Sequence, residues 1–107
     1  MSPELPVLVQ RTLDRLIRAF APERVVLFGS YAKGTIRPSS DIDLLIIANI
    51  VGNLELHQRR ARQLTANCFP RVDVVLCTPL AVAEAHKARS PILLSILGSG
   101  ITVYSRS

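Results

Sequence analysis

Apolar residues at helical spacing mark the first segment of the chain. They recur on one face through residues 3–20, and Pro22 follows where a helix would stop, so the pattern predicts a helix there. Arg11, Arg15 and Arg18 fall together on the outer face of this helix. Such a stripe is typical of solvated surface, and contact with a partner is the alternative.

Short apolar runs that end at turn residues predict four strands, at residues 24–28, 42–48, 71–78 and 101–104. Residues 42–48 have the composition of a strand buried on both faces, and residues 72–76 that of a buried central strand. Helical spacing, caps and prolines predict further helices at residues 54–68, 79–89 and 91–97, with a brief helix at 30–34 and a loop at 34–40. Gly98 and Gly100 are expected to form a break before the last strand.

This alternation of helices and strands predicts the fold class. Apolar strands need cover on both faces, so we expect an α/β (α+β) protein with a mixed sheet of about four strands covered by helices. The 107 residues, 49% hydrophobic and 20% charged, fit a single domain over residues 1–107 and exclude a disordered chain. The longest nearly apolar run, at 44–51, is far shorter than the roughly 18 residues of a membrane span, and the start lacks a secretion signal. We therefore expect a cytoplasmic protein with no membrane association.

The net charge of +5 predicts an acidic partner. A phosphate-bearing small molecule, an RNA and an acidic protein surface would all suit this charge. Arg59, Arg60 and Arg62 form a second basic group, with the same two interpretations as the first stripe. Cys68 and Cys77 lie in apolar stretches and are interpreted as buried thiols, and the isolated His57 and His86 as surface or capping residues.

Asp41 and Asp43 are the first candidates for chemistry. They lie two positions apart at the start of a strand, so both carboxylates emerge on the same face. Two such charges repel each other beside an apolar sheet, and Mg²⁺ is a natural counter-ion because it prefers carboxylate and phosphate oxygens. A solvated Asp pair at a strand end is the alternative.

Asp73 interrupts an otherwise apolar strand, and a charge there needs compensation. If this strand pairs beside the strand at 42–48, Asp73 joins Asp41 and Asp43 around one or two metal ions. An ion pair with Arg71 or another arginine is the alternative.

Gly29 and Ser30 follow the first strand and open a helical turn. Free backbone N–H groups at such a turn favour a phosphate, and a glycine lets the ligand approach the backbone closely. An ordinary strand-to-helix turn is the alternative.

In combination these residues resemble a known family. Leu27-Phe28-Gly29-Ser30, ten further residues, Asp41-Ile42-Asp43-Leu44 and then Asp73 in a later strand are similar to the nucleotidyltransferase superfamily that includes DNA polymerase beta. The whole chain resembles the minimal nucleotidyltransferases of that superfamily, and its closing strand, at 100–104, fits as well. Tyr31 stands where many relatives carry Arg, so one basic contact to the nucleotide phosphates is expected to be either absent or supplied by Lys33.

The resemblance implies a reaction and a set of roles. Gly29, Ser30, Lys33 and Ser40 would bind the nucleotide, and Asp41, Asp43 and Asp73 would be both metal ligands and catalytic residues. Mg²⁺, in two ions, would be the cofactor and ATP the substrate. Minimal nucleotidyltransferases are similar to the antitoxin of two-gene modules whose toxin is a HEPN ribonuclease, and such antitoxins transfer AMP onto a toxin tyrosine. We therefore expect AMP transfer (AMPylation) to a HEPN toxin, without direct binding of nucleic acid.

Two alternatives follow from the same residues. The acceptor can instead be a small hydroxylated molecule or an RNA end. In the other alternative the chain is a catalytically silent antitoxin that neutralises its partner by covering it, which the three aspartates argue against.

Overall fold

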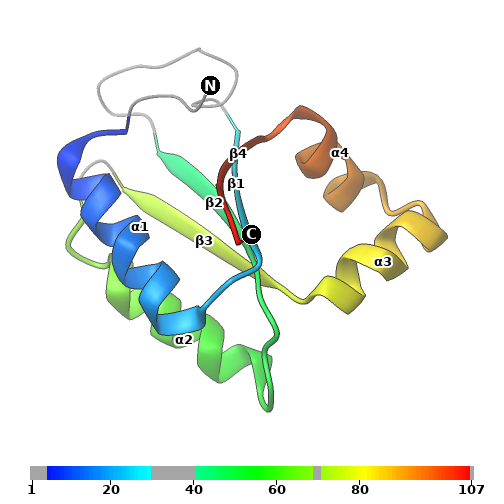
Figure 1. Ribbon diagram of the computed structural model, residues 1–107, viewed down its shortest axis with the longest axis horizontal. Coiled ribbons are helices and arrows are strands. Elements are labelled where there is room, and N and C mark those ends of the chain that lie inside the picture. The colour runs from blue at the N-terminus through cyan, green and yellow to red at the C-terminus, as the bar shows by residue number, and fades with distance from the viewer. Residues whose placement is uncertain (1–4, 30–40, 69–70, 107) are drawn as a thin grey trace.

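The protein is a four-stranded mixed sheet with two helices on each face (Figure 1). A computed structural model describes residues 5–29, 41–68 and 71–106. In chain order the elements are α1 (Val7–Phe20), β1 (Arg24–Phe28), β2 (Ile42–Ile47), α2 (Leu54–Thr65), β3 (Val72–Cys77), α3 (Pro79–Ala88), α4 (Pro91–Ser99) and β4 (Ile101–Ser105). This architecture confirms the predicted fold class. The brief helix expected at 30–34 and the loop at 34–40 lie outside the described residues.

The strand order is β3-β2-β1-β4. β1 is antiparallel to both β2 and β4, whereas β2 and β3 are parallel. Parallel neighbours cannot be joined by a tight turn, and α2 supplies the crossover between them. The starts of β2 and β3 therefore lie at the same end of the sheet as the end of β1.

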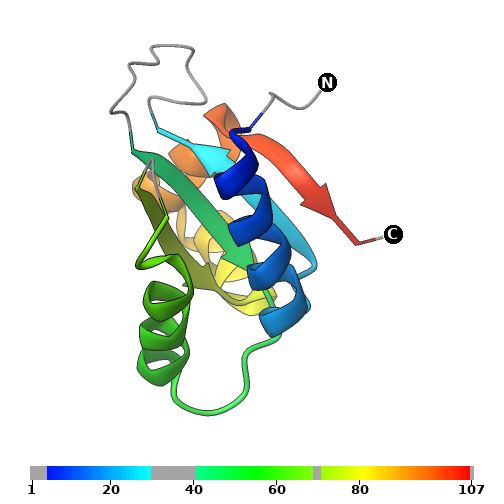
Figure 2. The same cartoon turned by 90° about the vertical axis from the view of Figure 1, so that its left-hand side faces the viewer.

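Strand alternation divides the core between the two faces of the sheet. Ile42, Leu44 and Ile46 of β2 pack with α1 and α2, whereas Leu45 and Ile47 pack with α3 and α4. Figure 2 shows α1 and α2 side by side over one face, with α3 and α4 behind the sheet. β2 is buried on both faces, as its composition predicts.

Local signals fix most helix ends. Pro6 has extended backbone (φ −53°, ψ 149°) and precedes α1, so this helix begins at Val7 instead of residue 3. The Asn53 side chain caps α2 by accepting hydrogen bonds from the N–H groups of Glu55 and Leu56. α2 ends at Thr65, three residues before the predicted end at Cys68, because the chain tightens there and the Cys68 N–H donates to the Thr65 carbonyl.

The predicted break at Gly98 is wrong. α4 continues through Gly98 to Ser99, and the chain leaves the helix at Gly100, which has extended backbone (ψ 164°). A single glycine costs a helix only about 1 kcal/mol, which packing of α4 on the sheet can offset.

β3 is an edge strand, and the prediction of a central strand is wrong. Its apolar residues Val72, Val74 and Leu76 are buried on one face, which says nothing about whether both backbone edges are paired. Val75 is 45% exposed, and the open edge meets a side chain of α2. The Gln58 amide donates from Nε2 to the Val74 carbonyl at 2.6 Å and accepts from the Leu76 N–H at 3.0 Å. Gln58 thus takes the place of a neighbouring strand for the two peptide units that flank Val75.

The exposure of the arginines, histidines and cysteines can be compared with the predictions. The arginines of both basic groups are exposed, and His86 lies on the surface. His57 is half-buried, and its Nε2 lies within hydrogen-bond distance, 3.0 Å, of the Val51 carbonyl oxygen. Cys77 is a buried free thiol, whereas Cys68 is free but only half-buried. Among the described residues, no helix is long and apolar enough to cross a membrane.

Candidate active site

Strand pairing brings two acidic residues together at one end of the sheet. Asp43 of β2 lies directly beside Asp73 of β3 in the parallel register, and on its other side Phe28 of β1 is its antiparallel partner. Phe28, Asp43 and Asp73 thus form one row across three strands. The predicted approach of Asp73 to Asp43 required β2 and β3 to be neighbours in the sheet, and they are.

The row points to the face that carries α3 and α4. Asp43 alternates with Ile42 and Leu44, whose side chains pack under α1 and α2, so its carboxylate emerges on the opposite side. The same alternation applies to Asp73 between Val72 and Val74. Both carboxylates are therefore accessible from one side of the sheet and are only half-buried.

Gly29 closes β1 beside this pair. Its backbone has φ +79°, a conformation that favours glycine. A Cβ atom at this position would collide with Oδ2 of Asp43. The lack of a side chain at Gly29 therefore makes room for the Asp43 carboxylate.

Both burial and neighbouring carboxylates disfavour the ionised form of Asp43. Burial raises the pKa of the Asp43 carboxyl, and the nearby charges of Asp73 and Asp41 raise this pKa further. Each cause penalises the ionised form. A cation beside Asp43 would offset the part of this penalty that comes from Asp73 and Asp41.

Arg71 supplies part of the missing positive charge. Its Nε donates to Oδ1 of Asp73 at 3.1 Å in an ion pair whose two side chains are 74% and 41% exposed. The ion pair that was the alternative interpretation of Asp73 is therefore present, and it coexists with the pairing to Asp43. An exposed pair of this kind is worth about 0–1 kcal/mol, so a divalent ion can displace it.

Of the other predicted site residues, the structure describes Asp41 but not those at 30–40. Asp41 precedes β2 and is exposed, close enough for its charge to act on Asp43. Among the described residues, no three His, Cys, Asp or Glu side chains are gathered as a ready metal site, so the trio of aspartates stays a prediction. Ser30, Lys33 and Ser40 lie outside the described residues, as does Tyr31.

The pair is suited to Mg²⁺ by its donor chemistry. Mg²⁺ binds one or two carboxylates and completes its coordination with water and substrate phosphates. Asp43 and Asp73 provide two hard oxygen donors side by side, with a third carboxylate, Asp41, close enough for its charge to act on Asp43. The residues present therefore fit the ion that the sequence predicts.

Sequence reasoning did not single out Phe28 as a member of this row. Its position immediately before Gly29 was part of the recognised motif, but only the register of β1 with β2 shows that it faces Asp43. The alternation of apolar residues within a strand gives the face of each side chain and leaves the register open.

Two solved structures share this fold. A crystal structure of a toxin-antitoxin with AMP-PNP is 24% identical, with a TM-score of 0.60 over 92% of this chain and 74% of its own. A candidate nucleotidyltransferase from Sulfolobus solfataricus is 21% identical, with a TM-score of 0.57 over 92% of this chain and 78% of its own. No curated protein matches the sequence.

The sequence profile of one family covers almost the whole chain. The family described as Polymerase beta, Nucleotidyltransferase matches residues 11–107, which include the Gly29 turn and all three aspartates. The protein therefore belongs to the polymerase beta nucleotidyltransferase family.

Proposed function

We propose that this nucleotidyltransferase transfers AMP from ATP onto a hydroxyl group in a Mg²⁺-dependent reaction, and that the acceptor is a tyrosine of a HEPN ribonuclease toxin. The observation that carries the proposal is the in-register pair of Asp43 and Asp73 beside the Gly29 turn. Paired carboxylates beside a glycine whose backbone a phosphate could approach suit the transfer of a phosphoryl-bearing group.

The proposed reaction is a displacement at the α-phosphorus of ATP. The acceptor hydroxyl oxygen forms a bond to this phosphorus, the bond to the oxygen bridging toward the β-phosphate breaks, and pyrophosphate leaves. Asp73 is only half-buried and can receive the proton that the hydroxyl loses. The products are an AMP ester of the acceptor and pyrophosphate.

Each remaining residue has a role in holding the reactants. Asp41, Asp43 and Asp73 would hold two Mg²⁺ ions, which when bound offset the charge that develops on the phosphates. Gly29 would let the triphosphate approach the backbone, with Ser30, Lys33 and Ser40 as further nucleotide contacts. Because such catalysis depends on positioning and charge, the loss of any one aspartate should be severe.

The toxin acceptor is supported by two considerations. The structural neighbour of this fold with the higher TM-score is a toxin-antitoxin complex with AMP-PNP, an ATP analogue. The described elements are all used by the sheet and its helices, so the acceptor surface would be shared with a partner. A cytoplasmic location follows from this proposal.

The test is to incubate the protein with ATP, Mg²⁺ and the protein encoded beside its gene, and to weigh both by intact mass spectrometry. We expect AMP units on the neighbouring protein. Asp41→Asn, Asp43→Asn and Asp73→Asn should each slow transfer by about 10²-fold or more. Asp14→Asn, an exposed aspartate on α1, is the matched control and should keep full activity.

The other outcomes separate the alternatives. An unmodified neighbour in a tight complex would favour a silent antitoxin. Transfer to RNA or to a small hydroxylated molecule, and not to the neighbour, would keep the reaction and change the acceptor. Undiminished transfer by the aspartate variants would refute the assignment of the site.

A further inference from the structure

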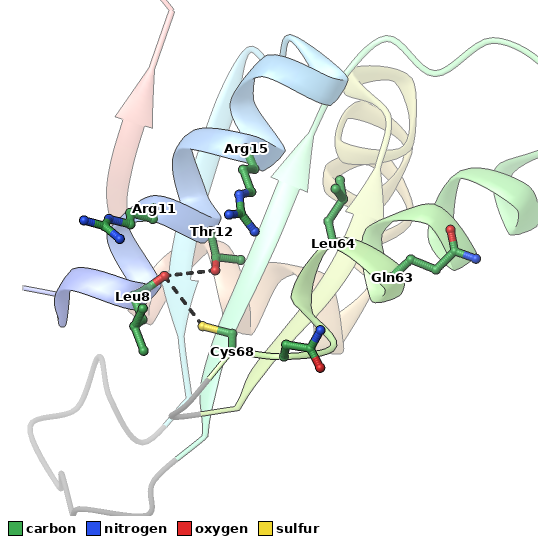
Figure 3. A pocket seen from close by; sticks show the side chains of 8 residues that line it. Leu8, Arg11, Thr12, Arg15, Gln63, Leu64 and Cys68 are labelled. Carbon is green, nitrogen blue, oxygen red and sulfur yellow. Dashed lines mark hydrogen bonds between the residues drawn. The ribbon is translucent and has the colours of Figure 1, made fainter.

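A cavity between α1 and α2 lies apart from the carboxylate pair. Its volume is about 360 Å³, within the range of roughly 300–1,000 Å³ that is usual for small-molecule sites. Thr12 and Arg15 of α1 form one wall, and Leu64 of α2 and Cys68 form the other (Figure 3). The cavity opens to solvent between the two helices.

The cavity carries positive charge and no carboxylate among its lining residues. Arg11 and Arg15 both line it, one helical turn apart. Among the described residues, neither guanidinium has an ion-pair partner. Like charges at this spacing destabilise a helix, so the two arginines cost the fold a little unless an anion lies between them.

The other lining groups suit the rest of a nucleotide. Leu8 and Leu64 provide apolar surface, and the side-chain amides of Gln63 and Asn67 offer both donors and acceptors. The hydroxyl of Thr12 and the thiol of Cys68 both donate to the Leu8 carbonyl, so they are already occupied. The free hydrogen-bonding capacity of the cavity therefore lies in the arginines and the amides.

The cavity is on the opposite face of the sheet from Asp43. Thr12 and Leu64 belong to the helices that cover the Leu44 face, whereas the carboxylates emerge on the face of α3 and α4. A ligand in the cavity therefore cannot touch the carboxylate pair, and the two sites can be occupied at once.

We propose that this cavity is a second nucleotide-binding site, in which Arg11 and Arg15 hold the phosphate and the apolar and amide groups hold the base. Two guanidinium forks one turn apart provide more donors than one carboxylate can accept, and a phosphate has the oxygens to use them. Binding here needs no divalent ion because the arginines supply the charge. The proposal does not depend on the transfer reaction.

Cys68 provides a reporter inside the cavity. In EDTA, AMP should slow the alkylation of Cys68 by N-ethylmaleimide by about fivefold or more, and Cys77, which is buried outside the cavity, is the internal reference. Peptide mass spectrometry measures both thiols in one sample. Equal rates at Cys68 with and without AMP, up to millimolar concentration, would overturn the proposal.

Charge reversal tests the arginines. Arg15→Glu and Arg11→Glu should weaken the protection by AMP about tenfold or more. Arg18→Glu is the matched control, because Arg18 is exposed on the same helix and does not line the cavity, and it should shift the half-protecting concentration by less than about twofold. Equal losses in all three variants would show a general charge effect and refute a site.

Two comparisons identify the source of the phosphate and separate this site from the active site. Protection by AMP at concentrations where a 5′-phosphorylated RNA gives none identifies a free nucleotide, whereas protection by the RNA with none from AMP would overturn the proposal. Protection by an acidic peptide alone would refute the nucleotide and indicate a protein partner. Asp43→Asn should keep full protection of Cys68, so a failure of the transfer reaction leaves this result unchanged.

Discussion

At the scale of single residues, Gly29 and Gly52 form a natural comparison. Both have positive φ, at +79° and +90°, so a side chain at either position strains the backbone. A Cβ at Gly29 would also collide with the Asp43 carboxylate, whereas a Cβ at Gly52 would meet nothing within 4 Å. The two glycines therefore separate backbone strain from contact with the site.

We predict that Gly29→Ala and Gly52→Ala each lower the free energy of unfolding by about 1–2 kcal/mol, because alanine disfavours this backbone conformation. Only Gly29→Ala should also slow nucleotidyl transfer, by about 10²-fold, because it displaces Asp43. Urea denaturation and the mass assay measure the two effects. Equal activity in both variants would show that Gly29 does not position the carboxylate.

Asp43 gives the protein a defined dependence on pH. Its pKa in the folded state is raised above the ordinary value of 3.8, so the folded protein binds this proton more tightly than the unfolded chain. The contribution of Asp43 to stability therefore falls as pH rises through the window from 3.8 to the raised pKa, and the full penalty remains at neutral pH.

We predict that Asp43→Asn raises the Tm at pH 7 in EDTA, because it removes an ionised group that burial and its neighbours disfavour. The gain should shrink as pH falls through the raised pKa and vanish below about 3.8. Thermal melts across pH measure it, with Asp14→Asn as an exposed control. A Tm of Asp43→Asn below that of the wild type at pH 7 would contradict the prediction.

The sequence made the site residues visible because charges in an apolar strand are conspicuous. Asp73 stood out for that reason and Asp43 for its two-residue spacing from Asp41, and the resemblance to a family joined them to Gly29. The ion pair of Arg71 with Asp73 could be named only as an alternative, since two residues at that spacing can lie on the same side of a strand with or without contact. The cavity beside Arg15 was not predictable, because it depends on how α1 and α2 pack.

At the scale of elements, Gln58 protects the outer edge of β3. Its amide bonds the Val74 carbonyl and the Leu76 N–H, the two groups that another chain would otherwise pair with. No sequence signal marks this role, because Gln58 lies on a helix and its partners are 16 and 18 residues away. The prediction of a central β3 was wrong for the same reason: an apolar strand does not reveal which of its edges is paired.

We predict that Gln58→Ala lowers the free energy of unfolding by about 1–3 kcal/mol, because two partly buried backbone groups lose their partner. Association that grows with protein concentration should accompany the loss. Urea denaturation and static light scattering test both effects. Gln63→Ala, an exposed glutamine on the same helix, should change neither.

At the scale of the whole molecule, the helices bury more apolar residues on one face of the sheet than on the other. The core under α1 and α2 contains buried residues from both helices and three strands. On the other face, α3 buries only Ala85 among the described residues, and α4 contributes the half-buried Leu93, Ile96 and Leu97. The sequence predicted helices on both faces and could not predict this difference, since α4 is the most apolar helix by composition.

We predict that backbone amides of α3 and α4 exchange with solvent at least about tenfold faster than those of α1 and α2, because less buried apolar surface holds them. Hydrogen exchange followed by mass spectrometry of peptides measures this. Slower exchange in α4 than in α1 would contradict the prediction. The helices predicted to unfold locally more often, α3 and α4, cover the face of the sheet on which the carboxylates of Asp43 and Asp73 emerge.

The direction of β4 has a practical consequence. β4 is antiparallel to β1, and Ser105 lies beside Arg24 at the end of the sheet away from Phe28. Arg106 continues this anchoring by donating its N–H to the Glu23 carbonyl at 2.8 Å. A biosensor tether or fluorescent protein joined after Arg106 would therefore start far from the aspartates, so immobilised protein should keep the end of the sheet that carries Asp43 and Asp73 open to solvent.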